Sequence, residues 1–191
     1  MTSNEDVQLI ERMVRGDEQA LGVIHAKYER AILNFIYRMV GNREMAEELS
    51  SDVFFRVWRK ASLFDARKGA FTTWLYQVAG NVTRNRLESA WRRSPLAPLH
   101  EDDRLPASAP GPDADAIAGE QQEQVRAALL TLRPADRMIL VLRHFEERST
   151  SEIAAIVRVP EGTVKSRVHY ALQRLKRVLL PELESPARGE S

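Results

Sequence analysis

The chain has 191 residues, of which 43% are hydrophobic, and its 28 Lys and Arg against 27 Asp and Glu give a net charge of +1. This length allows one ordinary domain or two small ones. The absence of cysteine excludes disulfides, thiolate zinc sites and a cysteine nucleophile, and it fits the cytoplasm, where we expect this protein. No segment has the apolar length of a signal peptide or a membrane span. Any signal for a charged partner must therefore lie in the distribution of charge.

The N-terminal half shows apolar residues at helical spacing and no alternation typical of strands. Four helices are predicted, covering about 7–14, 21–39, 46–58 and 70–93, and the first should stop at Gly16. Their short connections favour a helix bundle.

Composition changes abruptly over residues 94–119, which hold five prolines, five acidic residues and few large apolar groups. Such a segment buries too little apolar surface to offset its ordering entropy. We therefore predict an all-α protein of two small helical domains, joined by a flexible acidic Pro-rich linker, that move independently unless a partner fixes them. The expected boundaries are 1–93, 94–119 for the linker, 120–183, and 184–191 for a tail.

Helical spacing resumes at Glu120, first through Leu132 and then from Met138 to Phe145, and two shorter helices should follow. The segment 151–170 has the spacing of a helix-turn-helix. The features that favour this motif are a small residue where the helices cross (Ala154), a core face (Ile153, Ile156, Val157), an apolar residue ten positions beyond the crossing (Val164) and a start for the second helix (Pro160, Thr163). Many such turns hold Gly where this chain has Arg158, so the turn must tolerate a side chain.

The second helix of this motif is predicted to be amphipathic and basic. Its inner side should carry Val164, Val168, Ala171, Leu172 and Leu175, and its outer side Ser166, His169, Tyr170 and Gln173. Basic residues flank the outer side (Lys165, Arg167, Arg174, Lys176, Arg177), and no carboxylate lies between Glu161 and Glu182. Such a face suits a major groove and its phosphates. A basic helix can also be a solvated surface, which is the alternative.

The helix from about residue 70 carries a line of aromatic, amide and basic side chains beside its apolar stripe: Trp74, Gln77, Asn81, Arg84 and Asn85. Rings stack on unpaired bases and amides bond to base edges, while Arg84, Arg86, Arg92 and Arg93 can hold the backbone of an opened strand. The alternative is that Trp74 belongs to the core and Asn81 is merely solvated.

The preceding helix concentrates acid instead: Glu44, Glu47, Glu48 and Asp52, with Phe55 and Arg56 nearby. Because an acidic, partly apolar face repels phosphate, it indicates a protein partner.

Two passages carry a resemblance to one family. One runs from Asn42 to Trp58 (NREMAEELSSDVFFRVW) together with 71–81 (FTTWLYQVAGN), and the other holds EIA from Glu152 and PEGTVKSR from Pro160. In this order and spacing they resemble regions two and four of the extracytoplasmic-function sigma factors of bacterial RNA polymerase.

The resemblance implies three sets of contacts. The acidic helix would dock on core polymerase through Glu47, Glu48, Ser51, Asp52, Phe55 and Arg56, with Ser51 where the family often has glutamine. The minus-ten element and a flipped base would be bound by the 64–69 loop and the next helix, through Phe64, Lys68, Trp74, Gln77, Asn81, Arg84, Asn85 and Arg86. The minus-thirty-five element would be read by Arg143, Thr163, Lys165, Ser166, Arg167, His169, Tyr170 and Arg174, and Tyr170, where Arg is common, should alter the preference there.

The resemblance further implies that the linker threads through the polymerase, that promoter melting is assisted, and that an anti-sigma factor holds the protein inactive. A dimeric helix-turn-helix regulator acting at an operator is the alternative, and it explains only the C-terminal half. No enzyme, cofactor or metal is expected, because the four histidines are scattered and no phosphate loop or metal-ligand spacing occurs.

Overall fold

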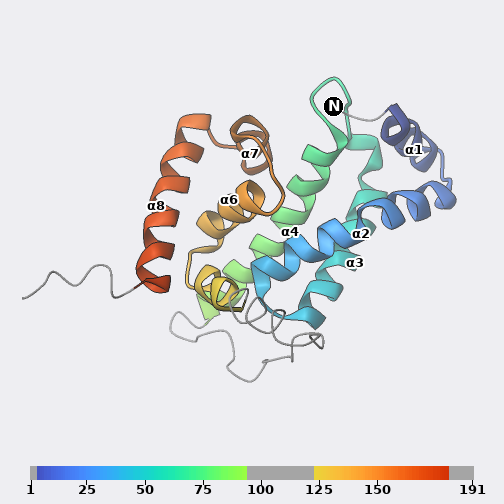
Figure 1. Ribbon diagram of the computed structural model, residues 1–191. Helices are drawn as coiled ribbons and strands as arrows, with labels where there is room; N and C mark the ends of the chain where they lie inside the picture. The colour runs from blue at the N-terminus through green and yellow to red at the C-terminus, as the bar shows by residue number, and fades with distance from the viewer. Residues whose placement is uncertain (1–3, 94–122, 181–191) are drawn as a thin grey trace, which may run out of the picture.

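The structure is a computed structural model that describes residues 4–93 and 123–180 (Figure 1). Over these residues it is all-helical, without a strand, as predicted. The predicted linker and tail lie outside the described residues. None of the described helices is long and apolar enough to cross a membrane.

The N-terminal half follows the predicted bundle closely. Its helices are α1 (Asn4–Val14), α2 (Glu18–Val40), α3 (Arg43–Arg59) and α4 (Phe71–Arg93), with a short 3-10 turn η1 (Ala61–Leu63) that the periodicity did not predict. Helix α2 packs along α1, α3 and α4 (Figure 1).

The boundaries of α2 have clear local causes. The Asp17 carboxylate accepts hydrogen bonds from the backbone N–H groups of Gln19 and Ala20, which the first turn of a helix leaves without partners. At the other end Gly41 has φ +76°, the left-handed conformation that a glycine adopts without a Cβ clash. Gly16, where the first helix was predicted to stop, also has positive φ.

The C-terminal half begins with helical residues 123–130, followed by α6 (Pro134–His144), α7 (Thr150–Val157) and α8 (Glu161–Leu179). The predicted helix-turn-helix is α7 and α8. The expectation that its helices are shorter was wrong for α8, which has 19 residues against 11 in α6. Helix α8 extends beyond the motif because its apolar residues keep helical spacing to Leu179.

Side-chain burial confirms most of the predicted helix-turn-helix core, including Ile153, Ile156, Val164 and Ala171. One expected core residue differs. Leu172 is 40% exposed, because it lies at the edge of the inner face of α8. Phe145 is also 40% exposed, because α6 ends before it and its ring lies under the Arg38 guanidinium.

Arg158 occupies the turn between α7 and α8 with φ +57° and ψ +50°. The turn therefore uses the left-handed conformation that glycine usually supplies, and it does so with a side chain. This confirms the expectation drawn from the missing glycine.

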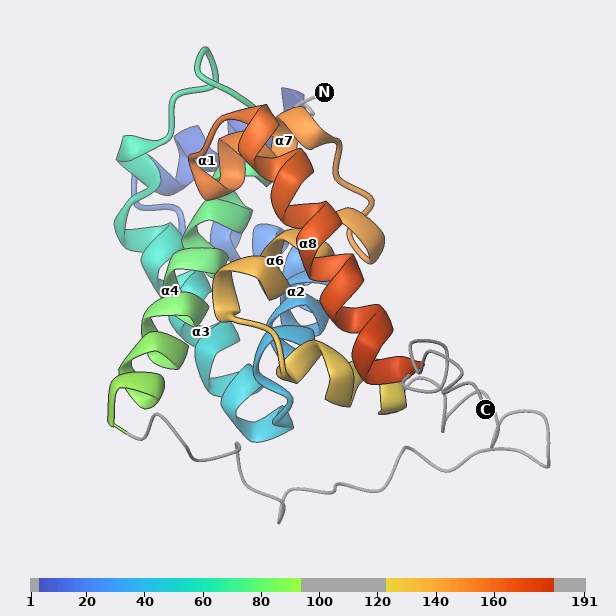
Figure 2. The ribbon, with the colours of Figure 1, turned by 90° about the vertical axis from the view of Figure 1, so that its left-hand side faces the viewer.

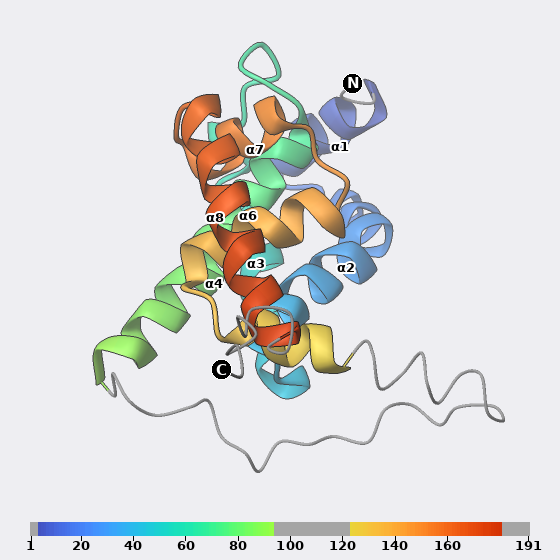
Figure 3. The same cartoon turned by 60° about the vertical axis from the view of Figure 1, so that its left-hand side comes forward.

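The two halves pack against each other, a contact that the composition of the linker did not predict. Helix α6 lies against α2 and α4, and α7 lies against α4 (Figures 1 and 3). A single hydrophobic core joins them. The close approach depends on small residues, since a Cβ on Gly80 of α4 would lie 3.1 Å from the Met138 sulfur of α6.

Candidate nucleic-acid interface

The flank of α4 that was predicted to meet unpaired bases lies at the surface. Asn81 and Asn85 are exposed, while Gln77 and Arg84 are partly buried. The Arg84 guanidinium donates a 3.0 Å hydrogen bond to the Asn81 carbonyl oxygen, which leaves the Asn81 amide N–H groups pointing away from this bond. The amides are thus accessible to a strand laid along α4.

Trp74 is partly a core residue and partly a surface residue, so it fits both interpretations of its position in the sequence. It is partly buried, with its ring centroid 5.7 Å from that of Phe64 and 5.9 Å from that of Phe71. Phe71 is fully buried, so the three rings run from the core towards the surface. Such a cluster fixes the orientation of Trp74 and leaves part of it in contact with solvent.

The loop before α4 presents basic side chains around one anchored carboxylate. Asp65 accepts hydrogen bonds of 2.9 Å from both Nε and Nη2 of Arg67 and one of 3.1 Å from its backbone N–H. These bonds lower the pKa of Asp65 to about 2. Arg67 and Lys68 nevertheless remain 91% and 84% exposed. Arg67 was missed by the sequence reasoning, although its place between Asp65 and Lys68 was a visible signal.

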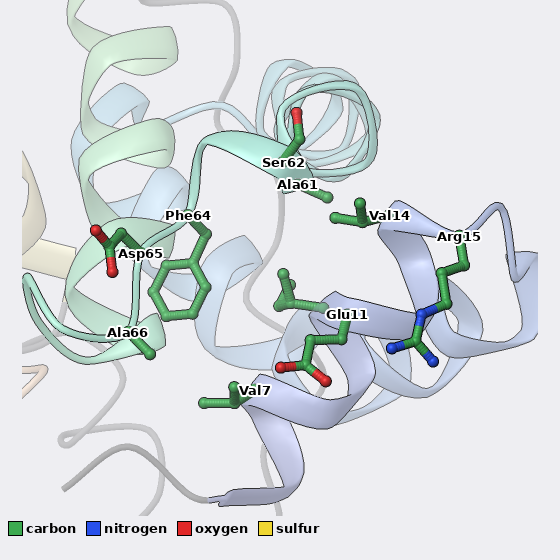
Figure 4. A pocket seen from close by; sticks show the side chains of 10 residues that line it. Val7, Glu11, Val14, Arg15, Ala61, Ser62, Phe64, Asp65 and Ala66 are labelled. Atoms are coloured by element: carbon green, nitrogen blue, oxygen red, sulfur yellow. The ribbon is translucent and has the colours of Figure 1, made fainter.

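An open cavity of about 440 Å³ lies beside this loop. Figure 4 shows the side chains that line it. Phe64 and Ala61 line one side, and Val7 and Val14 of α1 line the other. The cavity is mostly apolar, and Glu11 is one of the charged residues that line it.

Helix α8 lies on the outside of the molecule, with α6 between it and the N-terminal helices (Figure 2). Most of its predicted DNA-facing residues are exposed: Lys165, Ser166, His169, Tyr170 and Arg174. Thr163 and Arg167 are partly buried, and Arg143 is exposed near the end of α6. The set is brought to one helix face as predicted, apart from Arg143.

Hydrogen bonds within α8 orient part of this face. The Ser166 hydroxyl donates to the Thr163 carbonyl oxygen at 3.0 Å, and His169 and Gln173 lie 2.9 Å apart through their side-chain nitrogens. Tyr170 is 68% exposed, so its ring projects from the helix. The Arg143 guanidinium donates to the Arg148 carbonyl oxygen at 3.3 Å, which directs it along its own loop.

The acidic residues of α3 form an exposed surface, as do the other residues predicted to bind polymerase: Glu47, Glu48, Ser51, Asp52, Phe55 and Arg56. Phe55 is 59% exposed, with the Arg59 guanidinium over its ring at 5.8 Å. Glu48 lies 3.9 Å from Arg86 of α4, so the acidic surface borders the basic side of the α4 flank.

The sequence reasoning missed the polar residues that join the two halves. Glu146 accepts a hydrogen bond from the Tyr76 hydroxyl and pairs with Arg38 at 3.4 Å. Gln77, assigned to DNA, donates a 2.9 Å hydrogen bond to the Ala155 carbonyl oxygen of α7. Their partners are about 70 or more positions distant in sequence, and no local pattern marks them.

The sequence matches two family profiles that follow the two halves. Sigma-70 region 2 matches residues 24–93, and Sigma-70 region 4 matches residues 128–177. The two matched ranges leave residues 94–127 between them.

Full-length relatives are similar over almost the whole chain. The RNA polymerase sigma-H factor of Pseudomonas aeruginosa is 32% identical over 190 residues, covering 96% of this chain and 98% of the relative. The ECF RNA polymerase sigma-E factor of Escherichia coli is 27% identical over 183 residues, covering 92% and 95%.

Two solved structures share the fold. CnrH, in complex with the cytosolic domain of CnrY, gives a TM-score of 0.68 at 19% identity over 94% of this chain and 99% of that one. The sigma factor RpoE of Bartonella quintana, in complex with the anti-sigma factor NepR, gives a TM-score of 0.65 at 22% identity. The match covers 84% of this chain and 97% of that one. From the two regions in their order and the full-length similarity, the chain belongs to the extracytoplasmic-function sigma factors of bacterial RNA polymerase.

Proposed function

We propose that this sigma factor directs core RNA polymerase to its promoters through three surfaces, on α3, α4 and α8, and assists promoter melting. The main support is that two surface faces of different chemistry occur in one chain: a basic face on α8 and an amide-rich flank on α4. Duplex DNA suits the first and unpaired bases suit the second. We propose residues 1–93 and 120–183 as the two domains, with 94–119 as linker.

Helix α8 would read the minus-thirty-five element as a duplex. Lys165, Ser166, His169 and Tyr170 face outward together and would meet base edges in the major groove. Arg174 lies on the same exposed side and would contact phosphate, which adds affinity without reading sequence.

The α4 flank would bind the minus-ten element after its strands separate. Trp74 presents the edge of an aromatic cluster for stacking, and Asn81 and Asn85 present amides to base edges. Holding an unpaired base offsets the free energy of unstacking, which is how binding assists melting. Lys68 and Arg86 would contact the backbone.

The acidic surface of α3 would dock on core polymerase. Phe55 offers exposed apolar area, and Glu47, Glu48 and Asp52 place negative charge on the preceding turns of α3. An aromatic anchor within complementary charge is typical of protein interfaces.

We further propose an anti-sigma factor as regulator and the cytoplasm, where RNA polymerase acts, as its location. The regulator is supported by the similar structure of the sigma factor RpoE, which was solved in complex with the anti-sigma factor NepR.

Reconstitution with core polymerase tests the proposal. The wild-type protein should bind core enzyme and produce new transcripts from a promoter library, while Phe55→Ala should weaken binding to core at least about tenfold, since an exposed aromatic anchor is lost. Leu63→Ala, which removes another exposed apolar side chain outside the α3 surface, is the control and should bind normally. Absence of a complex and of new transcripts would refute the sigma function, and tight binding to a symmetric duplex operator without polymerase would support the regulator instead.

A further inference from the structure

Glu146 joins the two halves of the molecule through a mostly buried carboxylate. It follows α6 in the chain, and its side chain is 9% exposed. It accepts a 2.5 Å hydrogen bond from the Tyr76 hydroxyl of α4 and lies 3.4 Å from the Arg38 guanidinium of α2. A buried carboxylate is stable only when partners replace its water, so Glu146 favours the closed arrangement through its contacts with Tyr76 and Arg38.

The surroundings of Tyr76 reinforce this contact. Tyr76 is 2% exposed, and its ring packs against Phe35 of α2 and beneath the Arg148 guanidinium at 4.7 Å. Burial, together with the Glu146 carboxylate, raises the pKa of Tyr76, so its hydroxyl remains a donor at neutral pH.

Helix α7 makes a second contact, and it does so on the proposed minus-ten flank. The Gln77 amide donates a 2.9 Å hydrogen bond to the Ala155 carbonyl oxygen, and the Arg158 guanidinium donates to the Gln77 oxygen at 3.4 Å. Both ends of this amide are therefore engaged, one by α7 and the other by the turn that follows it. The views agree that α7 lies beside the first turns of α4 (Figures 1 and 3).

We propose that Glu146, Tyr76 and Arg38 form an autoinhibitory latch that holds the free protein closed, with α7 covering Gln77. The role of Gln77 rests on the proposed function, whereas the latch itself does not. In the closed form the faces of α8 and α4 are held at one fixed separation, and a DNA strand reaches Gln77 only after α7 leaves. Release requires that a partner compensate the loss of these contacts.

Energy transfer within the free protein tests the latch without polymerase or DNA. Because the chain has no cysteine, Arg30→Cys and Lys176→Cys, both at exposed positions, place one dye on each half. The wild type should show one high-transfer population. Glu146→Gln and Tyr76→Phe should each raise the ratio of open to closed molecules about tenfold, since each weakens a buried charge-assisted hydrogen bond.

Matched controls show whether opening is specific to the latch or follows from any loss of a carboxylate charge or a tyrosine hydroxyl. Glu147→Gln makes the same charge change at the exposed neighbour of Glu146. Tyr28→Phe removes a hydroxyl that donates to Asp6 within the N-terminal half. Both controls should stay closed. Circular dichroism distinguishes opening from unfolding, because an open chain keeps its helices.

A reversible crosslink gives a second, independent readout. Gly80→Cys with Met138→Cys joins α4 to α6, where a Cβ on Gly80 would lie 3.1 Å from the Met138 sulfur. The pair should oxidise readily in the free protein, and oxidised protein should lose at least about tenfold in promoter-specific transcription and regain it on reduction.

Three results would overturn the latch: a wild type that is open, Glu146 and Tyr76 variants as closed as the controls, or an oxidised pair as active as the reduced one. Closed free protein that supports no transcription in any form would instead refute the proposed function and leave the latch standing.

Discussion

Among single residues, Arg137 shows how a charged side chain holds the two halves together. It is 2% exposed, and its guanidinium donates to the carbonyl oxygens of Leu129, Leu130 and Leu132. It also donates to the Met39 carbonyl oxygen, at the end of α2. Burial lowers the pKa of Arg137 to about 10, which leaves it charged at neutral pH. One side chain therefore satisfies backbone acceptors from both halves.

Arg137→Met should lower the free energy of unfolding by about 3 kcal/mol, because these buried carbonyl oxygens lose their donor. Urea denaturation followed by circular dichroism measures this. Arg133→Met, which removes an exposed partner of Asp136 on the same helix, should cost under about 1 kcal/mol. Equal losses in the two variants would contradict the role given to Arg137.

Ser149 begins α7 through a motif that is visible in the sequence. Its side chain accepts the Glu152 backbone N–H, and its own N–H donates to the Glu152 carboxylate at 2.9 Å. This capping box, a serine followed three positions later by glutamate, starts α7. The Ser149 N–H and then its hydroxyl lower the pKa of Glu152.

Ser149→Ala should cost about 1 kcal/mol at neutral pH, while Ser149→Thr, which keeps the oxygen, should cost less. Because the pKa of Glu152 is lower in the folded state, its contribution is complete above the unfolded value near 4.5 and is lost as the pH falls through the folded value. Urea denaturation at neutral pH and below pH 4 should therefore show a smaller gap between Ser149→Ala and wild type in acid. A gap that widens in acid would contradict this assignment.

At the level of helices, periodicity predicted nearly every element. The four N-terminal helices and the helix-turn-helix follow from apolar residues that recur every three to four positions, and Gly41 and Arg158 mark ends that backbone conformation explains. Periodicity does not distinguish the centre of a face from its edge, which is why Leu172 is exposed. Periodicity also does not show which helices pack against one another, so only the structure shows that α6 and α7 contact α4.

Substitutions at two glycines distinguish the cost of backbone strain from the cost of a clash between the two halves. Gly16 and Gly41 both have positive φ, but a Cβ at Gly16 meets nothing within 4 Å, whereas one at Gly41 would lie 2.6 Å from Leu130. Gly16→Ala should cost about 1 kcal/mol from backbone strain alone. Gly41→Ala should cost more, because Leu130 must also move. Thermal unfolding of both variants measures the difference, and equal costs would show that Leu130 yields freely.

For the whole molecule, the sequence predicted the helices, and the structure shows how the two halves pack together. The nucleic-acid faces of α4 and α8 were predicted from residue chemistry, and most of their residues are exposed as that chemistry requires. Gln77 differs, because α7 and the turn after it engage both ends of its amide. Helix order and local chemistry could be inferred from the sequence, whereas hydrogen bonds between residues 70 or more positions apart could not.

The proposed function assigns α8 and α4 to different parts of one promoter. Transcription by reconstituted holoenzyme from a library with both promoter elements randomised tests it directly, with the wild type, Lys165→Ala and Asn81→Ala compared by sequencing the transcripts. Lys165→Ala should change preference only in the upstream element, by about 1–3 kcal/mol at the affected base pair. Asn81→Ala should change the downstream element and slow strand opening without weakening polymerase binding. If both substitutions altered the same element, or if neither altered any preference, the assignment of the two faces would be wrong.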